Sequence, residues 1–108
     1  MTHSRYRLLI DDLHEAASST WVVARTSSEA ISLLELHGCP YEISFDHDLR
    51  ADDTAMAVVK KLIETDLDSD GRFIPEDFKF FAHGANPAGK ENIHLTLQSY
   101  LNQRATRH

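Results

Sequence analysis

The chain has 108 residues, of which 42% are hydrophobic and 26% are charged, and its formal net charge is −6. These values are typical of one soluble globular domain, which we expect to span residues 1–108. The negative charge excludes a general attraction to DNA, RNA or acidic membranes, so any contact with a nucleic acid must be local. The main candidates for such a contact are Lys90, Arg104 and Arg107.

The single cysteine, Cys39, excludes an internal disulfide and a cysteine-based metal cluster. The first residues contain no apolar signal-peptide segment, and no apolar run approaches the length of a membrane span. We therefore expect a cytoplasmic protein with no membrane partner. The oligomeric state is left open.

Strand and helix patterns alternate along the chain. Four apolar runs predict strands at residues 5–10, 21–24, 43–49 and 78–82. Three stretches with apolar residues at helical spacing predict helices: one from the capping box Thr26–Glu29 to Gly38, one after Asp52-Asp53-Thr54, and one that opens with Asn86 and Pro87. Residues 102–108 are polar, and we expect them to form a frayed tail.

This order predicts a small, doubly wound α/β fold with a mainly parallel sheet of about four strands and three main helices. Only ten residues separate Ile10 from Trp21, so the first crossover helix must be reduced to about one turn. Whether the second strand pairs parallel or antiparallel is left open.

Three of these strands end in polar residues that could bind a ligand. Asp11-Asp12 follows the first strand, Asp46-His47-Asp48 ends the third, and His83 follows the fourth. The carboxyl ends of parallel strands line the ligand crevice of open α/β sheets, so these groups are expected to converge. Since side chains alternate along a strand, Asp46 and Asp48 should share one face, with His47 on the other. The alternative interpretation is a pair of solvated loop residues that cap the next helix.

The acidic pair after strand one and the aspartate after strand three resemble a response-regulator receiver. A receiver also needs a Ser or Thr after strand four and a Lys-Pro after a fifth strand. Here strand four ends in His83, and Lys90 lies within a helix. The groups needed for phosphotransfer are therefore missing.

A closer resemblance is carried by Phe45-Asp46-His47-Asp48-Leu49 and by the segment from His83 to Ile93, which contains His-x-x-Asn-Pro-x-Gly-x-x-Asn. These motifs resemble the cyclic-phosphate-processing receiver-like domains, small bacterial and phage proteins, over nearly the whole chain. The resemblance implies processing of cyclic phosphate at RNA ends. The chain departs from it at Arg50 and at Thr54-Ala55, where the family often has glycine; these positions shape loops and carry no chemistry.

The same residues could support the opening of a 2′,3′-cyclic phosphate in RNA or a nucleotide. Carboxylates would hold a divalent cation, Mg²⁺ or Mn²⁺ for oxygen ligands alone, and a histidine ligand would favour Mn²⁺ or Zn²⁺. The candidate metal ligands are Asp11, Asp12, Asp46 and Asp48. The candidate catalytic groups are His47 and His83, as general acid or base, with Asp46 and Asp48. The candidate phosphate-binding residues at the start of the third helix are Asn86, Gly89 and Lys90.

Two of these assignments have plainer alternatives: His83 as a histidine bonded to the backbone, and Asn86 as a simple helix cap. At the level of the whole protein, a metal-assisted phosphoesterase competes with a non-catalytic receiver-like binding or regulatory module, for example in a phage–host setting. The presence of all the expected acids and both histidines favours the phosphoesterase.

The segment from Asp66 to Asp77 has the spacing Asp-x-Asp-x-Asp-Gly of a calcium loop. Position twelve is Asp77 where glutamate is usual, Pro75 is unusual at position ten, and a strand follows where a second helix is needed. A solvated acidic turn that leads into strand four is the preferred interpretation.

Overall fold

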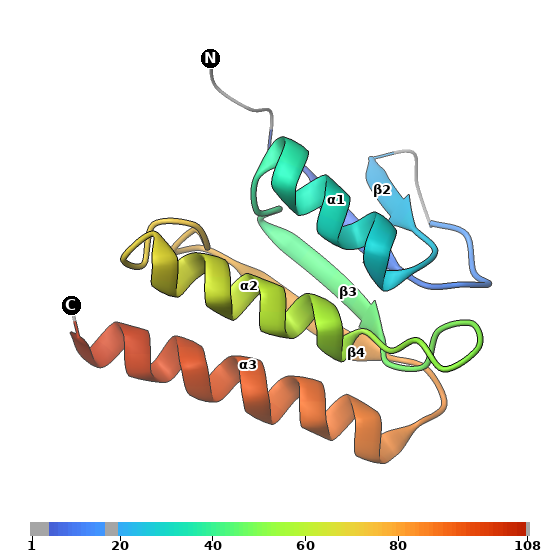
Figure 1. Cartoon of the computed structure of the whole chain (residues 1–108). Coiled ribbons are helices and arrows are strands. Elements are labelled where there is room, and N and C mark those ends of the chain that lie inside the picture. The colour runs from blue at the N-terminus through green and yellow to red at the C-terminus, as the bar shows by residue number, and fades with distance from the viewer. Residues whose placement is uncertain (1–4, 17–19, 108) are drawn as a thin grey trace.

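The computed structural model describes residues 5–16 and 20–107. Its elements are β1 (Arg7–Ile10), β2 (Trp21–Ala24), α1 (Ser27–His37), β3 (Glu42–Asp46), α2 (Met56–Asp68), β4 (Lys79–His83) and α3 (Pro87–Arg107). The strands form one parallel sheet in the order β2-β1-β3-β4 (Figure 1). The small receiver-like α/β fold is confirmed, and β2 is parallel to β1.

The chain passes from β1 outward to β2 and then returns past β1 to β3 and β4. The strands are thus added first on one side of β1 and then on the other. In an open α/β sheet the ligand crevice forms at this switch in strand order, here between β1 and β3. In the connection from β1 to β2, residues 11–16 contain no helix, in agreement with the expected reduction of the first crossover.

All three helices lie on the same face of the sheet (Figure 1). Helix α1 packs against β1 and β2, α3 packs against β4, and α2 lies between the other two helices. No helix among the described residues covers the opposite face, although parallel sheets are usually covered on both sides. That face, which carries Leu9, Ser44 and Phe81, is called the open face below. None of the described helices is long and apolar enough to cross a membrane.

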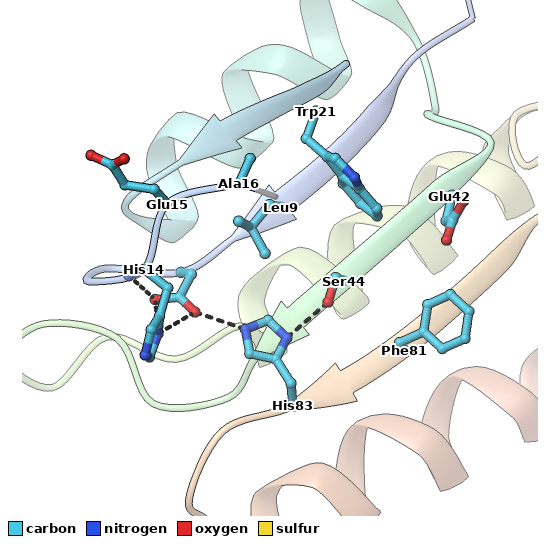
Figure 2. Close-up of a pocket in the computed structure, with 10 residues that line it drawn as sticks. Leu9, His14, Glu15, Ala16, Trp21, Glu42, Ser44, Phe81 and His83 are labelled. Carbon is cyan, nitrogen blue, oxygen red and sulfur yellow. Dashed lines mark hydrogen bonds and ion pairs between the residues drawn. The ribbon is translucent and has the colours of Figure 1, made fainter. Parts of the chain in front are cut away.

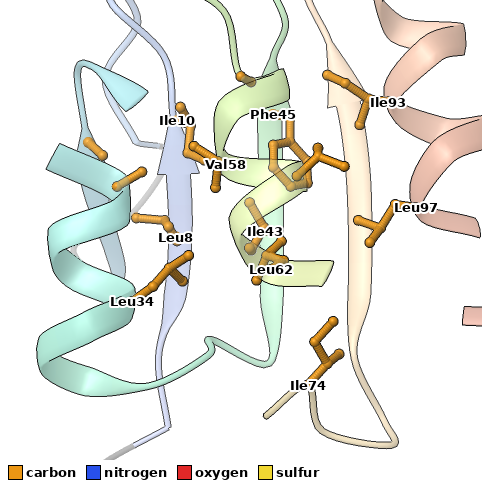
Figure 3. Packing of buried hydrophobic residues seen from close by; sticks show 14 of the residues in the cluster. Leu8, Ile10, Leu34, Ile43, Phe45, Val58, Leu62, Ile74, Ile93 and Leu97 are labelled. Atoms are coloured by element: carbon orange, nitrogen blue, oxygen red, sulfur yellow. The ribbon is translucent and has the colours of Figure 1, made fainter. Parts of the chain in front are cut away.

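The hydrophobic core lies between the sheet and the helices. Alternate strand residues point into it, and five of them are fully buried: Leu8, Ile10, Ala24, Ile43 and Phe45. Helix residues complete the packing from the other side, as Figure 3 shows: Leu34, Val58, Leu62, Ile93 and Leu97. This alternation turns the neighbouring residues of β1 and β3 toward the open face.

The start of α1 is held by its own cap and by a more distant residue. Thr26 accepts a hydrogen bond from the backbone N–H of Glu29, at 3.0 Å, as the capping box predicts. The carboxylate of Asp53 accepts from the backbone N–H and the hydroxyl of Ser27, at 2.8 and 2.5 Å. Asp53 therefore caps α1 from the loop after β3, and α2 begins at Met56 with no side-chain cap.

The acidic segment after α2 is anchored by a buried carboxylate. Asp66 is fully buried and accepts hydrogen bonds from the backbone N–H groups of Phe73 and Ile74, at 3.0 and 2.8 Å. The Tyr100 hydroxyl donates to it at 2.6 Å, and Arg104 lies 3.4 Å away. Asp66 is thus not a solvated turn residue, and the preferred interpretation of this position was wrong, because its neighbours provide the donors that a buried carboxylate needs.

The same contacts explain why α3 extends to Arg107. Arg104 also donates to the backbone carbonyl of Ile74 at 2.7 Å, and its side chain is 11% exposed. The expected fraying of residues 102–107 is therefore wrong, and residue 108 lies outside the described residues. Since Arg104 is engaged in the fold, it is also not a free contact for nucleic acid.

We predict that Asp66→Asn lowers the free energy of unfolding by about 3 kcal/mol, because it removes one partner of a buried charge pair. Asp68→Asn, in the same segment but exposed, should change it by less than about 0.5 kcal/mol. Urea denaturation followed by circular dichroism measures both. Equal effects of the two substitutions would contradict this role of Asp66.

A pH dependence follows from the same residue. Burial opposes ionisation of Asp66, but hydrogen bonds from Ile74, Tyr100 and Phe73 and the charge of Arg104 outweigh it and lower the pKa. The stabilisation is thus present above the unfolded-state pKa of about 4 and is lost as the pH falls below it. We expect the stability of the wild type to fall more steeply than that of Asp66→Asn below about pH 5. Parallel curves in urea titrations at several pH values would contradict this.

Candidate functional site

The centre of the candidate site is the carboxylate of Asp11, which follows β1 and is 1% exposed. It accepts hydrogen bonds from the backbone N–H groups of Leu13 and His14, each at 2.9 Å. The Nδ1 atom of His14 lies 3.0 Å from its other oxygen. The loop that supplies these donors is fastened by Arg25, whose guanidinium donates to the backbone carbonyls of Asp11 and His14. The carboxylate of Asp11 is therefore buried, and hydrogen-bond donors of the protein replace the water that it would otherwise contact.

His83 reaches Asp11 from the end of β4, across the end of β3. Its Nε2 atom lies 2.8 Å from Asp11 Oδ2, and its Nδ1 atom lies 2.8 Å from the hydroxyl oxygen of Ser44 (Figure 2). An ionised carboxylate can only accept hydrogen bonds, so the proton of a neutral His83 ring lies on Nε2 and the Ser44 hydroxyl donates to Nδ1. This chain fixes both the orientation and the tautomer of the imidazole.

Asp46, the last residue of β3, completes the central cluster. One ligand atom each from Asp11, Asp46 and His83 lies within 4.8 Å of the others, a spacing that a single metal ion could bridge. Gly84 follows His83 with φ of +102°, and a Cβ atom there would collide with the Asp46 carboxylate. Glycine is therefore needed for β4 to end so close to Asp46. We call Asp11, Asp46 and His83 the central cluster.

The two carboxylates of the central cluster have opposite pKa shifts. Burial opposes ionisation of Asp11, but the hydrogen bonds from His14, Leu13 and His83 outweigh it and hold the pKa well below its usual range. Burial and the nearby charge of Asp11 raise the pKa of Asp46, and the charge of Asp12 adds to this effect. The crowding of negative charge at Asp46 is what a bound cation would relieve.

Four other residues form a second group beside the central cluster: His47, Asp48, Asn86 and Gly89. Both oxygens of Asp48 lie 3.1 Å from Asn86 Nδ2, and His47 Nδ1 lies 2.7 Å from Asp48 Oδ1. Asn86 Oδ1 also accepts from the backbone N–H of Gly89 at 2.9 Å, so this residue caps α3 and binds Asp48. Hydrogen bonds from His47 and Asn86 lower the pKa of Asp48.

His47 is held tightly within this second group. Its side chain is 14% exposed, and a Cβ atom at Gly89 would collide with the imidazole ring. Gly89 thus allows α3 to begin against His47. His47 therefore lies where the segment Asp46-His47-Asp48 contacts the start of α3, which was predicted to bind phosphate.

The structure divides the predicted site residues into these two groups. Asp46 and Asp48 do not share one cluster, because β3 ends at Asp46 and strand alternation stops there. Asp12 lies outside the central cluster, and its charge contributes to the raised pKa of Asp46. Lys90, in the first turn of α3, makes a backbone hydrogen bond to Asn86.

A cavity of about 480 Å³ opens beside the central cluster, on the open face of the sheet (Figure 2). Asp11, His14, Ser44 and His83 lie along one part of it. Further from the cluster its walls are apolar and aromatic, with Leu9, Trp21 and Phe81. The charged residues Glu15 and Glu42 lie at its margin. The cavity therefore joins a site able to transfer protons to a surface able to bind a flat apolar group.

Two residues of this site did not emerge from the sequence. Ser44 lies two residues before Asp46 and so shares its face, and strand alternation could have identified it. His14 carried no such signal, because its position depends on a loop that folds back onto Asp11.

A comparison with known protein families matches residues 6–99 to the cyclic-phosphate processing receiver domain. No curated protein and no solved structure gives a significant match. The match spans most of the chain, from the strand before Asp11 to well inside α3. The chain therefore belongs to the family of cyclic-phosphate processing receiver domains.

Proposed function

We propose that this protein is a metal-assisted phosphoesterase that opens cyclic phosphates, either at 2′,3′-cyclic phosphate RNA ends or in cyclic nucleotides. The observation that carries the proposal is the hydrogen-bonded chain from Asp11 through His83 to Ser44, at the edge of an open cavity. Membership of the family supports the substrate class. The proposal assigns the chemistry to the central cluster.

In the proposed reaction a water oxygen forms a bond to phosphorus, and the bond from phosphorus to one ribose oxygen breaks. The proton of the water passes to a base, and the departing ribose oxygen receives a proton, so a phosphate monoester is formed. His83 is suited to both transfers, because it lines the cavity and its Nδ1 atom is bonded to the hydroxyl of Ser44, a contact that a substrate can replace. The ionised Asp11 stabilises the positive charge that the ring carries between the two steps.

Asp46 and Asp11 are suited to hold a divalent cation, with His83 as an alternative third ligand. A cation bound there would neutralise charge on the phosphate and lower the pKa of a bound water. Oxygen ligation by the two carboxylates favours Mg²⁺ or Mn²⁺. The raised pKa of Asp46, caused by burial and by the charge of Asp11, fits a position that has affinity for a cation.

The second group is suited to position the phosphate. Asn86 and Gly89 lie at the start of α3, where backbone N–H groups and the helix dipole favour an anion. Lys90 follows in the same turn and adds positive charge. His47 and Asp48, joined at 2.7 Å, are the alternative acid–base pair if the phosphate lies closer to this group.

We predict that Mg²⁺ or Mn²⁺ raises the melting temperature of the wild type, because a cation that binds only the folded protein stabilises it. Asp46→Asn should abolish most of this shift. Asp70→Asn is the matched control and should retain it, because Asp70 is exposed and the segment after α2 lies at the opposite end of the sheet from the site (Figure 1). A shift that is lost only in Asp70→Asn would assign the cation to the acidic segment and contradict the proposed site.

We predict that His83→Ala lowers the turnover of a 2′,3′-cyclic nucleotide by about 10²–10⁴-fold with the fold intact, because it removes the acid–base group. Lys90→Ala should mainly raise KM. Glu91→Ala, exposed on the same helix, is the control and should turn over substrate at the wild-type rate. His47→Ala decides between the two groups: a larger loss there than in His83→Ala would move the acid–base role to His47.

The alternative function is a non-catalytic receiver-like binding or regulatory module. To distinguish this module from a phosphoesterase, the wild type is incubated with a panel of cyclic nucleotides, once with added Mg²⁺ or Mn²⁺ and once with a chelator. If no cyclic phosphate is opened under any of these conditions, the phosphoesterase proposal fails and the binding module takes its place.

A further inference from the structure

We propose that the aromatic part of the cavity on the open face is a nucleobase-binding subsite, in which the base of the substrate packs against Trp21. This inference rests on the proposed function, since it assumes that the phosphate lies at the central cluster. It adds to that function that the substrate is a nucleoside derivative recognised through its base. A cyclic phosphate without a base would then be a poor substrate.

The first support is that a single cavity contains both the polar site and the aromatic surface. His83 and Ser44 lie along it beside the central cluster, and Trp21 and Phe81 lie along it further back on the sheet (Figure 2). Its volume of about 480 Å³ is within the range of about 300–1,000 Å³ that is usual for small-molecule sites. A ligand whose phosphate contacts His83 therefore extends over the open face.

The second support is the distance along the strands. Trp21 pairs in register with Arg7, which pairs with Glu42, and Glu42 lies four residues before Asp46 on β3. At about 3.3 Å per residue, the two levels of the sheet are about 13 Å apart. A nucleotide laid along the strands places its phosphate at the level of Asp46, its ribose over Ser44 and Leu9, and its base toward Trp21.

The third support is the chemistry of the walls. Base–aromatic stacking gives sequence-tolerant affinity for single nucleotides, and Trp21 is the largest aromatic side chain along this cavity. The guanidinium of Arg7 lies over its indole, 5.1 Å from the ring centroid, and helps to fix the ring. Phe81, which also lines the cavity, is 53% exposed, so its ring is accessible to a ligand.

Glu42 gives the subsite a preference among bases. Its carboxylate lies at the margin of the cavity and makes no hydrogen bond or ion pair with the residues that the structure describes. A carboxylate accepts hydrogen bonds from the exocyclic amino groups of adenine, cytosine and guanine, whereas uracil has no amino group and its one donor, the ring N3–H, lies between two carbonyl oxygens that a carboxylate repels. We therefore expect bases with an amino group to bind more tightly than uracil.

Trp21 is the only tryptophan in the chain, so its fluorescence reports directly on this subsite. We expect cytidine 2′-monophosphate, a product-like ligand that is not consumed, to quench the fluorescence of the wild type at saturation. Inorganic phosphate should leave the fluorescence unchanged. Glu42→Gln should reduce the preference for cytidine over uridine monophosphate, and Leu95→Ala, exposed on α3, is the matched surface control.

Turnover gives the second measurement. For cytidine 2′,3′-cyclic phosphate, Trp21→Leu should raise KM by about 10-fold to 100-fold with little change in kcat, because base stacking is worth about 1–3 kcal/mol. Trp21→Phe retains an aromatic ring and should restore most of the affinity. Circular dichroism shows whether each variant is folded, and the Phe variant keeps the test valid if the Leu variant is unstable.

The outcomes separate this inference from the proposed function. Turnover with equal KM for nucleoside and base-free ribose cyclic phosphates, without quenching, would overturn the base subsite and leave the phosphoesterase standing. Quenching by nucleotides without turnover would support the subsite and overturn the phosphoesterase. Fluorescence that responds to protein concentration and not to nucleotides would show that the open face joins two copies of the chain, and the inference would fail.

Discussion

The hydrogen bond between Asp11 and His83 determines the arrangement of the whole site. These residues lie at the ends of β1 and β4, which are not neighbours, because β3 runs between them. A buried carboxylate is stable only with donors around it, and here the first loop and the last strand each supply some of them. The bond thus ties the two halves of the sheet together above Ser44 and Asp46, and it gives His83 one defined orientation.

The two groups of polar residues are held in place by different parts of the fold. The central cluster belongs to strand ends and is held by the sheet. The second group belongs to the loop after β3 and the start of α3, joined by Asn86. Sites on regular elements are positioned more precisely than sites on loops. Under the proposed function, the central cluster would transfer protons and the second group would bind the phosphate, so the two tasks would fall to separately held parts of the site.

Much of this could be predicted from the sequence, for reasons that particular residues make clear. Asp46 and His83 were identified because strand patterns place them at carboxyl ends, and Asn86 because a helix cap has a local signature. The interpretation of Asp66 as part of a solvated turn was wrong, since its partner Tyr100 is distant in sequence and acidic residues in a polar stretch give no sign of burial. The prediction that Asp48 shares a face with Asp46 was wrong, because side chains alternate between the two faces of a sheet only within a strand and β3 ends at Asp46.

The position of β4 at the edge of the sheet has a consequence for the behaviour of the protein in solution. Three of the six residues from 78 to 83 are phenylalanine. A strand at the edge of a sheet also offers unpaired backbone groups to other chains. Lys79 and His83 are the polar residues that interrupt this run. Lys79 is exposed within β4, and a charged side chain on an edge strand disfavours pairing with another chain, so a variant that replaces Lys79 with an apolar residue is expected to associate more readily.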